Sequence, residues 1–206
     1  PILISIGGFK LYTYGLFVAL GFMIALWFSK KNAKFYRIGS QDISDLFFVI
    51  LVSAILGARL LYVAINYKDF LTNPLEIFKI WNGGLVFFGG FITAVITASV
   101  LLKLKNLPVW KTADIIAPGI ALGHSVGRIG CFFAGCCFGK SCDLPIAVRF
   151  THPESLAPLN SFLHPTQIYM VVSNLVLFLI LVWLQKRKKF HGMIFLVYIM
   201  LYSAFR

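Results

Sequence analysis

The segment WKTADIIAPGIALGHSVGRIGCFFAGCCFGK, residues 110–140, decides the fold class of this chain. Its first part, Trp110–Gly130, is an apolar run long enough to cross a bilayer as a helix, which takes about 20 residues. The run nevertheless carries Arg128 close to its end, and cysteines follow at once. Inserting an arginine at the centre of a membrane helix costs about 3 kcal/mol of free energy, so a charged residue within a membrane span suggests a function.

Five further apolar runs accompany this one: Leu11–Ser29, Ile43–Ile65, Leu85–Leu102, Thr166–Leu184 and Met193–Phe205. The 206 residues are 59% hydrophobic and only 13% charged, whereas soluble domains are about half apolar and about a quarter charged. We therefore expect an all-α polytopic membrane protein, a helical bundle of at least six spans that forms one transmembrane domain over residues 1–206. The apolar sequence at the end of the chain suggests a seventh span beyond it, and no signal-peptide pattern is apparent.

The charges predict the orientation. Basic clusters follow the first, third and fifth spans, whereas acidic residues balance the lysines of the second connection. Under the positive-inside rule the first, third and fifth connections are cytoplasmic, and residues 131–165 form a loop segment on the outer face. We expect a multi-pass protein of the bacterial cytoplasmic (inner) membrane whose active site faces the outer leaflet. The net charge of +12 therefore points to membrane topology and not to nucleic acid.

Three arginines on three spans approach the outer leaflet, namely Arg59, Arg128 and Arg206, with no carboxylate expected beside them. They could simply reach lipid headgroups by snorkelling. Alternatively, they form a site for a phospholipid phosphate, which a guanidinium binds through a two-pronged hydrogen bond. Tyr14 lies at the same depth and offers a hydroxyl to a headgroup. Small residues nearby either allow close helix packing or leave room for lipid; they include Gly89, Gly90 and Gly139.

Several motifs resemble the bacterial prolipoprotein diacylglyceryl transferases over essentially the whole chain. TYGLFVALGF (13–22), GARLLYV (57–63), WNGGLVFFGGFI (81–92) and YSAFR (202–206) are similar to spans of that family. Residues 113–139 resemble its signature region, and HPTQIY (164–169) resembles the segment before the fifth span. The pieces GRIG and HPTQ, in this order in a polytopic chain, carry the resemblance most strongly.

The resemblance implies an activity. The family transfers a diacylglyceryl group from phosphatidylglycerol to the lipobox cysteine thiol of a preprolipoprotein, which forms a thioether and releases glycerol 1-phosphate. The motif match places Tyr14, Arg128, Gly139 and Arg206 on functional positions, and Gln167 lies within HPTQ. The implied partners are phosphatidylglycerol, the lipobox segment and membrane lipid, with no cofactor and no metal.

The sequence also departs from the family pattern. Phe88 stands where the family usually has a histidine, and Cys131, Cys136 and Met170 replace polar residues. If the usual histidine is the base for the acceptor thiol, this chain needs another group. His124 lies four residues before Arg128 on the same helix face and could substitute, or it could serve packing alone.

Four cysteines lie within twelve residues on the predicted outer side: Cys131, Cys136, Cys137 and Cys142. An even number in an oxidising compartment favours disulfides, with 131–136/137–142 and 131–137/136–142 less strained than a bond between neighbours. Unpaired buried thiols are the second interpretation, and a metal or redox site the third. Two other functions stay open at this point: a non-catalytic lipid-binding or accessory membrane protein, favoured by Phe88, and a membrane thiol oxidoreductase.

Overall fold

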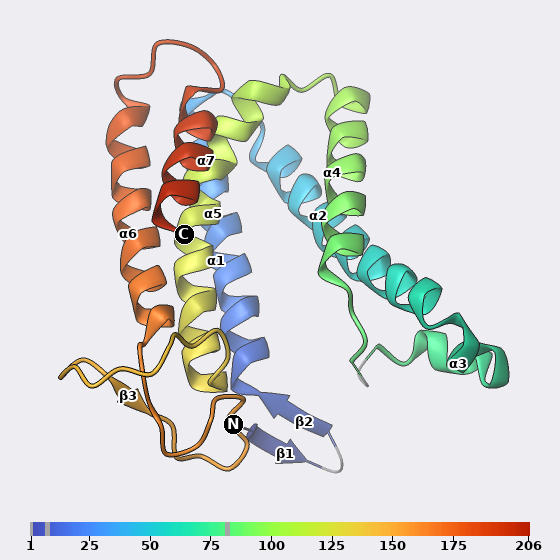
Figure 1. The fold of residues 1–206 in the computed structure, drawn as a ribbon. Coiled ribbons are helices and arrows are strands. Elements are labelled where there is room, and N and C mark those ends of the chain that lie inside the picture. Colours follow the sequence, from blue (N-terminus) through green and yellow to red (C-terminus); the bar gives the residue numbers. More distant parts are fainter. Residues whose placement is uncertain (1, 7–8, 81–82) are drawn as a thin grey trace. The chain divides into compact units, whose positions relative to one another are not determined.

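The computed structural model describes residues 2–6, 9–80 and 83–206 (Figure 1). Trp81 and Asn82 of the third motif lie outside the described residues. The elements in chain order are β1 (Ile2–Ile6), β2 (Phe9–Tyr12), α1 (Thr13–Phe35), α2 (Ser40–Ile65), α3 (Tyr67–Thr72), the 3₁₀ helix η1 (Pro74–Phe78), α4 (Phe87–Leu104), α5 (Val109–Ala134), β3 (Val148–Arg149), β4 (Phe162–Leu163), α6 (Thr166–Gln185) and α7 (Met193–Phe205).

Each of the six apolar runs forms one helix, which confirms the expected polytopic all-α class. Five of these helices, α1, α2, α4, α5 and α6, are long and apolar enough to cross a membrane, whereas α7 is shorter. The described chain divides into two compact units, residues 1–36 with 110–206 and residues 37–109. The single transmembrane domain over residues 1–206 stays a prediction.

In the first unit, α1 and α5 run antiparallel with their backbones close together. A Cβ added at Gly21 would lie 2.5 Å from the carbonyl oxygen of Gly123, and one added at Gly119 would lie 2.8 Å from that of Ala25. One turn further along, Asn32 donates to the carbonyl of Ile115 at 3.0 Å. Because only glycine fits such an approach, these small residues fix the α1–α5 packing.

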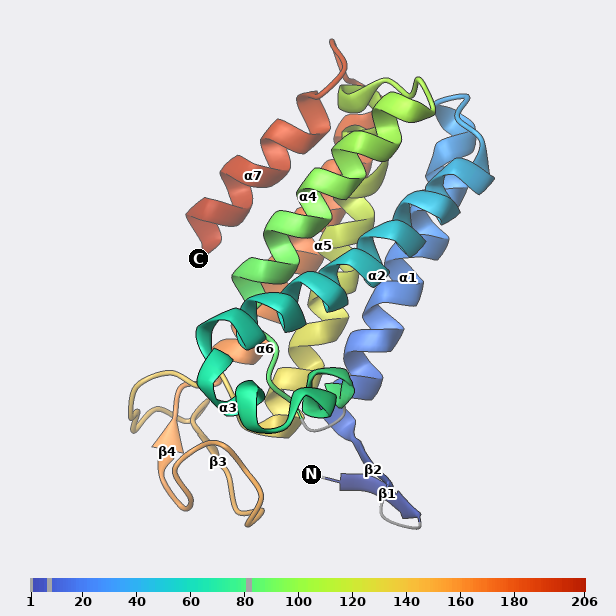
Figure 2. The same ribbon diagram turned by 90° about the vertical axis from the view of Figure 1, so that its right-hand side faces the viewer.

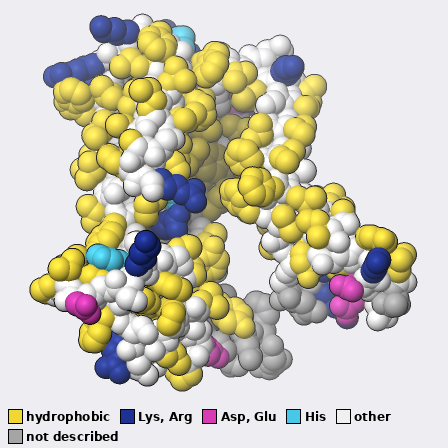
Figure 3. All heavy atoms as spheres, viewed as in Figure 1, with side chains coloured by type: hydrophobic (Ala, Val, Ile, Leu, Met, Phe, Trp, Pro, Cys, Tyr) yellow, Lys and Arg dark blue, Asp and Glu magenta, His cyan; other side chains and the backbone are white. Residues whose placement is uncertain are grey.

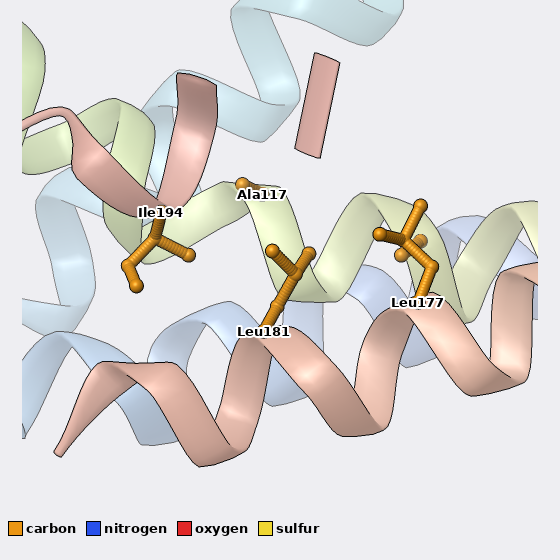
Figure 4. Close-up of a cluster of buried hydrophobic side chains, with 5 residues drawn as sticks. Ala117, Leu177, Leu181 and Ile194 are labelled. Atoms are coloured by element: carbon orange, nitrogen blue, oxygen red, sulfur yellow. The ribbon is translucent and has the colours of Figure 1, made fainter. Parts of the chain in front are cut away.

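Helices α5, α6 and α7 enclose the core of this unit. Ala117, Leu177, Leu181 and Ile194 are fully buried together (Figure 4), and Ala121 completes the cluster. The carboxylate of Asp114 accepts the backbone N–H groups at the start of α7. Since the first turn of a helix has unpaired N–H donors, this buried acid fixes where α7 begins.

This anchor sets α7 parallel to α5 with a defined register. Asp114 accepts from Gly192, 78 residues later in the chain. The rings of His124 and Tyr202, separated by the same offset, lie 5.4 Å apart by their centroids. Continuing that register brings Arg206 level with Arg128.

Residues 131–165 form irregular loops beyond the end of α5, with a short ladder in which Val148 pairs with Leu163 and Arg149 with Phe162 (Figure 2). Neither this ladder nor the β1–β2 hairpin was predictable from the sequence, because strands of two to five residues show too little alternation to detect. The ladder holds the loop against the start of α6, where Cys142 N–H donates to the carbonyl of Phe162 at 3.1 Å.

The second unit consists of α2, α3, η1 and α4, and α2 packs along α4. Gly57 and Gly89 face one another so closely that a side chain at either would collide with the other helix. The Thr93 hydroxyl donates to the carbonyl of Ser53 at 2.8 Å across the same interface. Near the other end of the pair, Lys105 forms ion pairs with Asp42, at 2.8 Å, and with Asp45.

Candidate functional site: an arginine pair beside a thiol cluster

Arg128 lies in the last two turns of α5 and is partly exposed. Its Nε donates to His124 Nε2 at 3.3 Å, one turn earlier on the same helix face. A ring nitrogen that accepts from a guanidinium carries no proton, so this contact assigns His124 as neutral imidazole with its proton on Nδ1. His124 therefore orients Arg128 in this structure, and its Nε2 lone pair is occupied.

Helix α7 adds a second cation and a phenol to this position. The Tyr202 hydroxyl lies within hydrogen-bonding reach of Arg128, and the charge of Arg206 acts on His124 together with that of Arg128. Figure 3 shows basic side chains gathered beside the end of α7, surrounded by hydrophobic surface. No carboxylate is paired with Arg128 or Arg206 among the described residues. The two guanidiniums thus form a cationic site in an apolar setting.

Sequence reasoning overlooked Tyr202 as a member of this site. The available signal was its spacing: Tyr202 precedes Arg206 by four residues and so shares its helix face. The ring of Tyr198 stacks on that of Tyr202, with the ring centroids 5.8 Å apart, and this contact helps to hold the Tyr202 ring in place. What the sequence could not supply was the register of α7 against α5.

Tyr14 reaches the same region from the first turn of α1. A Cβ added at Gly130 would lie 2.8 Å from Phe17 Cβ and 3.3 Å from the Tyr14 carbonyl oxygen, so α1 lies directly against the end of α5. The Tyr14 hydroxyl is close enough to Arg128 and to Cys131, Cys136 and Cys137 for their charges to interact. The structure therefore brings Tyr14, His124, Arg128 and Arg206 together at one end of the first unit, and their roles stay a prediction.

The cysteines do not form the expected disulfides. Cys131, Cys136, Cys137 and Cys142 are all free thiols in this structure. By spacing alone the four cysteines are equivalent partners, whereas the fold gathers the first three, with their Sγ atoms within 4.8 Å of one another. Cys142 is buried separately and accepts a hydrogen bond from Leu144 N–H at 3.4 Å.

Gln167 and Gly139 support the cysteine turn. Gln167, fully buried at the start of α6, donates from Nε2 to the carbonyl of Cys136 at 2.7 Å. Thr166 donates to the carbonyl of Cys137 at 2.6 Å. Gly139 donates to the carbonyl of His164 at 3.0 Å and leaves no room for a side chain. The HPTQ motif thus anchors the loop that carries the cysteines.

Burial, and to a smaller extent the neighbouring thiols Cys131 and Cys137, raise the pKa of the Cys136 thiol to about 12. A thiol in such an environment stays protonated at neutral pH unless a cation compensates its charge. Cys136 therefore does not have the lowered pKa that is typical of a reactive cysteine in a thiol oxidoreductase.

Arg59 belongs to the second unit and has a different environment from the one expected. It is only 7% exposed, and its guanidinium donates to the carbonyls of Glu76, Ile77, Gly83 and Gly84 at 2.5 to 3.1 Å. Four of its five N–H donors are accounted for by these bonds. The expected substrate-binding role is therefore not what the contacts favour: Arg59 cross-links the α3–α4 segment.

Gly89 and Gly90 were expected to leave room for a lipid, but both are buried against α2. A Cβ at Gly90 would lie 2.7 Å from the carbonyl oxygen of Ala54. Close helix packing explains them, which is the alternative that the sequence left open. Phe88, at the family's histidine position, is 68% exposed in the first turn of α4.

The fold and this site together define a class: a polytopic helical membrane protein with a cationic site built on the parallel ends of two apolar helices. The model of the family described as prolipoprotein diacylglyceryl transferase matches residues 1–206, and the chain belongs to this family. The resemblance found in the motifs is thereby confirmed.

Relatives named phosphatidylglycerol–prolipoprotein diacylglyceryl transferase agree over nearly the whole chain. The protein of Clostridium tetani is 37% identical over 100% of this chain and 82% of its own length. The protein of Finegoldia magna is 37% identical over 98% of this chain and 79% of its own length. That of Cupriavidus metallidurans is 36% identical over 100% and 77%.

Proposed function

We propose that this chain transfers the diacylglyceryl group of phosphatidylglycerol to the lipobox cysteine thiol of a preprolipoprotein, with Arg128 and Arg206 holding the donor phosphate. Family membership and the names of the relatives support the reaction. The observation that carries the site is the arginine pair at the ends of α5 and α7, in which His124 and Tyr202 orient Arg128 and the charge of Arg206 acts on His124.

The chemistry explains why two arginines suit this task. The acceptor sulfur forms a bond to the glyceryl carbon while the carbon–oxygen bond to the phosphate breaks, and the electron pair stays on the phosphate oxygen. Negative charge therefore grows on the phosphate in the transition state. Fixed guanidinium donors in an apolar site stabilise such charge without reorganising. The products are a thioether and glycerol 1-phosphate.

The acceptor thiol must lose its proton, and Phe88 cannot take it. His124 is a poor candidate for the base, because its Nε2 accepts from Arg128. A free thiol has a pKa near 8.5, so about a few per cent is thiolate at neutral pH, and a cationic pocket raises that share. The arginine pair thus serves the acceptor as well as the donor.

The orientation follows from the charges. The basic connections after the first, third and fifth spans lie in the cytoplasm, so the Arg128 end of the first unit faces the outer leaflet of the inner membrane. Phosphatidylglycerol and the lipobox segment of a secreted precursor both reach that side.

The test is transfer of labelled diacylglyceryl from phosphatidylglycerol to a lipobox peptide in detergent. Lysine keeps the charge of Arg128 but loses the planar fork, so Arg128→Lys and Arg128→Ala should both lower the rate about a hundredfold, or about 3 kcal/mol. Arg187→Lys is the matched control, because Arg187 is exposed and stacks on Trp183 away from this site.

A folded Arg128→Ala protein with near-normal transfer would overturn the assignment of Arg128. If the parent shows no transfer but retains bound anionic lipid that Arg128→Ala loses, the chain is a lipid-binding member of the family.

A further inference from the structure

The three gathered thiols have the arrangement of a metal ligand set. The Sγ atoms of Cys131, Cys136 and Cys137 all lie within 4.8 Å of one another. Around a zinc ion with about 2.3 Å Zn–S bonds, tetrahedral thiolates lie about 3.8 Å apart. The trio therefore needs to close by about 1 Å to surround a cation, whereas a disulfide would require two sulfurs to approach to about 2.05 Å.

The backbone brings these thiols together by a tight turn after α5. Gly135 and Cys137 both adopt left-handed conformations, with φ of 69° and 59°. The Cys136 N–H donates to the carbonyl of Cys131 at 3.1 Å, which closes the turn. Gln167 and Thr166 then hold the carbonyls of Cys136 and Cys137 from α6. These bonds use backbone atoms of the cysteines. The Cys136 thiol itself donates weakly to the carbonyl of Cys131, with 3.7 Å between sulfur and oxygen, and it gives up this contact when it loses its proton to bind a metal.

The surroundings leave one side of the trio open. Cys131 is buried, Cys136 half-buried and Cys137 exposed. Cys131 and Cys137 lie close enough to Arg128 for their charges to interact. A divalent cation with three thiolates carries one net negative charge, and a guanidinium beside it compensates that charge. Soft sulfur ligands select Zn²⁺ or Cu⁺ among common ions, and three protein ligands leave a fourth position for a further ligand.

We propose that Cys131, Cys136 and Cys137 bind Zn²⁺ and that its fourth position takes the acceptor thiol beside the arginine pair. This acceptor role rests on the proposed transferase function. Zinc deprotonates a coordinated thiol, and the proton leaves to solvent. The zinc-bound sulfur then attacks the glyceryl carbon, the carbon–oxygen bond breaks toward the phosphate, and the neutral thioether leaves the metal. The site would supply what Phe88 removes, namely the group that ionises the acceptor.

The first experiment measures metal binding by the reduced, detergent-purified protein, with Zn²⁺ titrated against a chromophoric chelator. The parent should bind one Zn²⁺ per chain. Cys142→Ser is the matched control, since Cys142 is the same residue type in the same loop but outside the trio, and it should bind equally. The double variant Cys136→Ser/Cys137→Ser removes two of the three sulfur ligands. Its affinity for Zn²⁺ should therefore fall by more than the roughly hundredfold that is lost when only a hydrogen-bond partner of a ligand is removed.

The second experiment tests the acceptor position without requiring turnover. Co²⁺ replaces Zn²⁺, and a lipobox peptide is added; the cobalt absorption should shift with the cysteine peptide and stay unchanged with its serine analogue. In the transfer assay, chelation should abolish the reaction and Zn²⁺ should restore it. If Zn²⁺ binds and the cobalt spectrum shifts while no transfer occurs, the proposed function fails and the metal site stands.

Three results would overturn the proposal. One is a folded, reduced parent that binds no Zn²⁺. Another is binding that survives in Cys136→Ser/Cys137→Ser. The third is a zinc-loaded protein whose transfer is indifferent to complete chelation, or whose cobalt form ignores the cysteine peptide.

Discussion

At the scale of the residue, Arg59 and Arg128 are the same side chain with opposite environments. Backbone carbonyls accept four hydrogen bonds from Arg59. Among the residues that the structure describes, the hydrogen-bond partners of Arg128 are an imidazole nitrogen and a phenol. A guanidinium has five donors, so Arg59 is nearly satisfied by the protein whereas Arg128 retains donors for a ligand. The neighbours, and not the residue type or its depth, separate a structural arginine from a binding one.

Replacing Arg59 should therefore affect stability before activity. Arg59→Ala leaves four carbonyls of the α3–α4 segment without a donor, and we expect the free energy of unfolding to fall by about 3 kcal/mol. Arg59→Lys should be milder, because one ammonium can satisfy some of these carbonyls. Thermal unfolding in detergent measures both, with Arg187→Ala as the control. An unchanged melting temperature combined with lost transfer would return Arg59 to the substrate site.

His124 separates a positioning role from that of a base. His124→Leu removes the acceptor that orients Arg128, and we expect transfer to fall about tenfold, or about 1.4 kcal/mol, chiefly through the KM for phosphatidylglycerol. His124→Gln offers an amide oxygen and should recover part of this loss. Rate against pH distinguishes the roles: its shape should be unchanged in both variants. Disappearance of a titration from the kcat profile would instead make His124 the base.

At the scale of the element, the apolar runs predicted each helix well. Met193–Phe205 was predicted with the same bounds as α7, and Thr166–Leu184 differs from α6 by one residue. The helix partners were not predictable, because most of the surface of a membrane helix is apolar whether it faces lipid or protein. The 78-residue register of α7 on α5 depends on Asp114, whose burial only the fold reveals. For the same reason, the sequence could not show that Cys142 lies apart from the other three cysteines.

Glycine shows this limit within a single helix. Gly123 and Gly127 lie one turn apart on α5, and the sequence alone does not distinguish them. A Cβ at Gly123 would lie 2.5 Å from the carbonyl oxygen of Gly21, whereas a Cβ at Gly127 would have no neighbouring atom within 4 Å. Gly123→Ala should therefore destabilise the protein by about 1–3 kcal/mol through overpacking against α1. Gly127→Ala should be neutral or stabilising by up to about 1 kcal/mol, since alanine favours helix. Melting temperatures in detergent compare the two, and equal values would contradict the close α1–α5 contact.

At the scale of the whole molecule, the first unit separates its charges toward two ends. Lys188, after α6, lies 3.6 Å from the ring centroid of Tyr36, after α1. The connections that follow the first and fifth spans therefore meet at one end of this unit, as a shared cytoplasmic side requires. Tyr36 is buried and Lys188 partly buried, and this burial raises the pKa of Tyr36 and lowers that of Lys188. The arginine pair and the cysteine turn lie toward the other end.

The orientation of the first unit in the membrane decides whether the arginine pair can meet its substrates. We expect single cysteines at positions 31 and 188 to be shielded from a membrane-impermeant thiol reagent in intact cells, because basic connections stay in the cytoplasm. A cysteine at the exposed Asn160 should be labelled, in a background whose four native cysteines are serine. Permeabilised cells provide the control that positions 31 and 188 can react at all. Labelling of those positions in intact cells would show that the protein has the opposite orientation. The arginine pair would then face the cytoplasm, where no secreted lipobox segment reaches it.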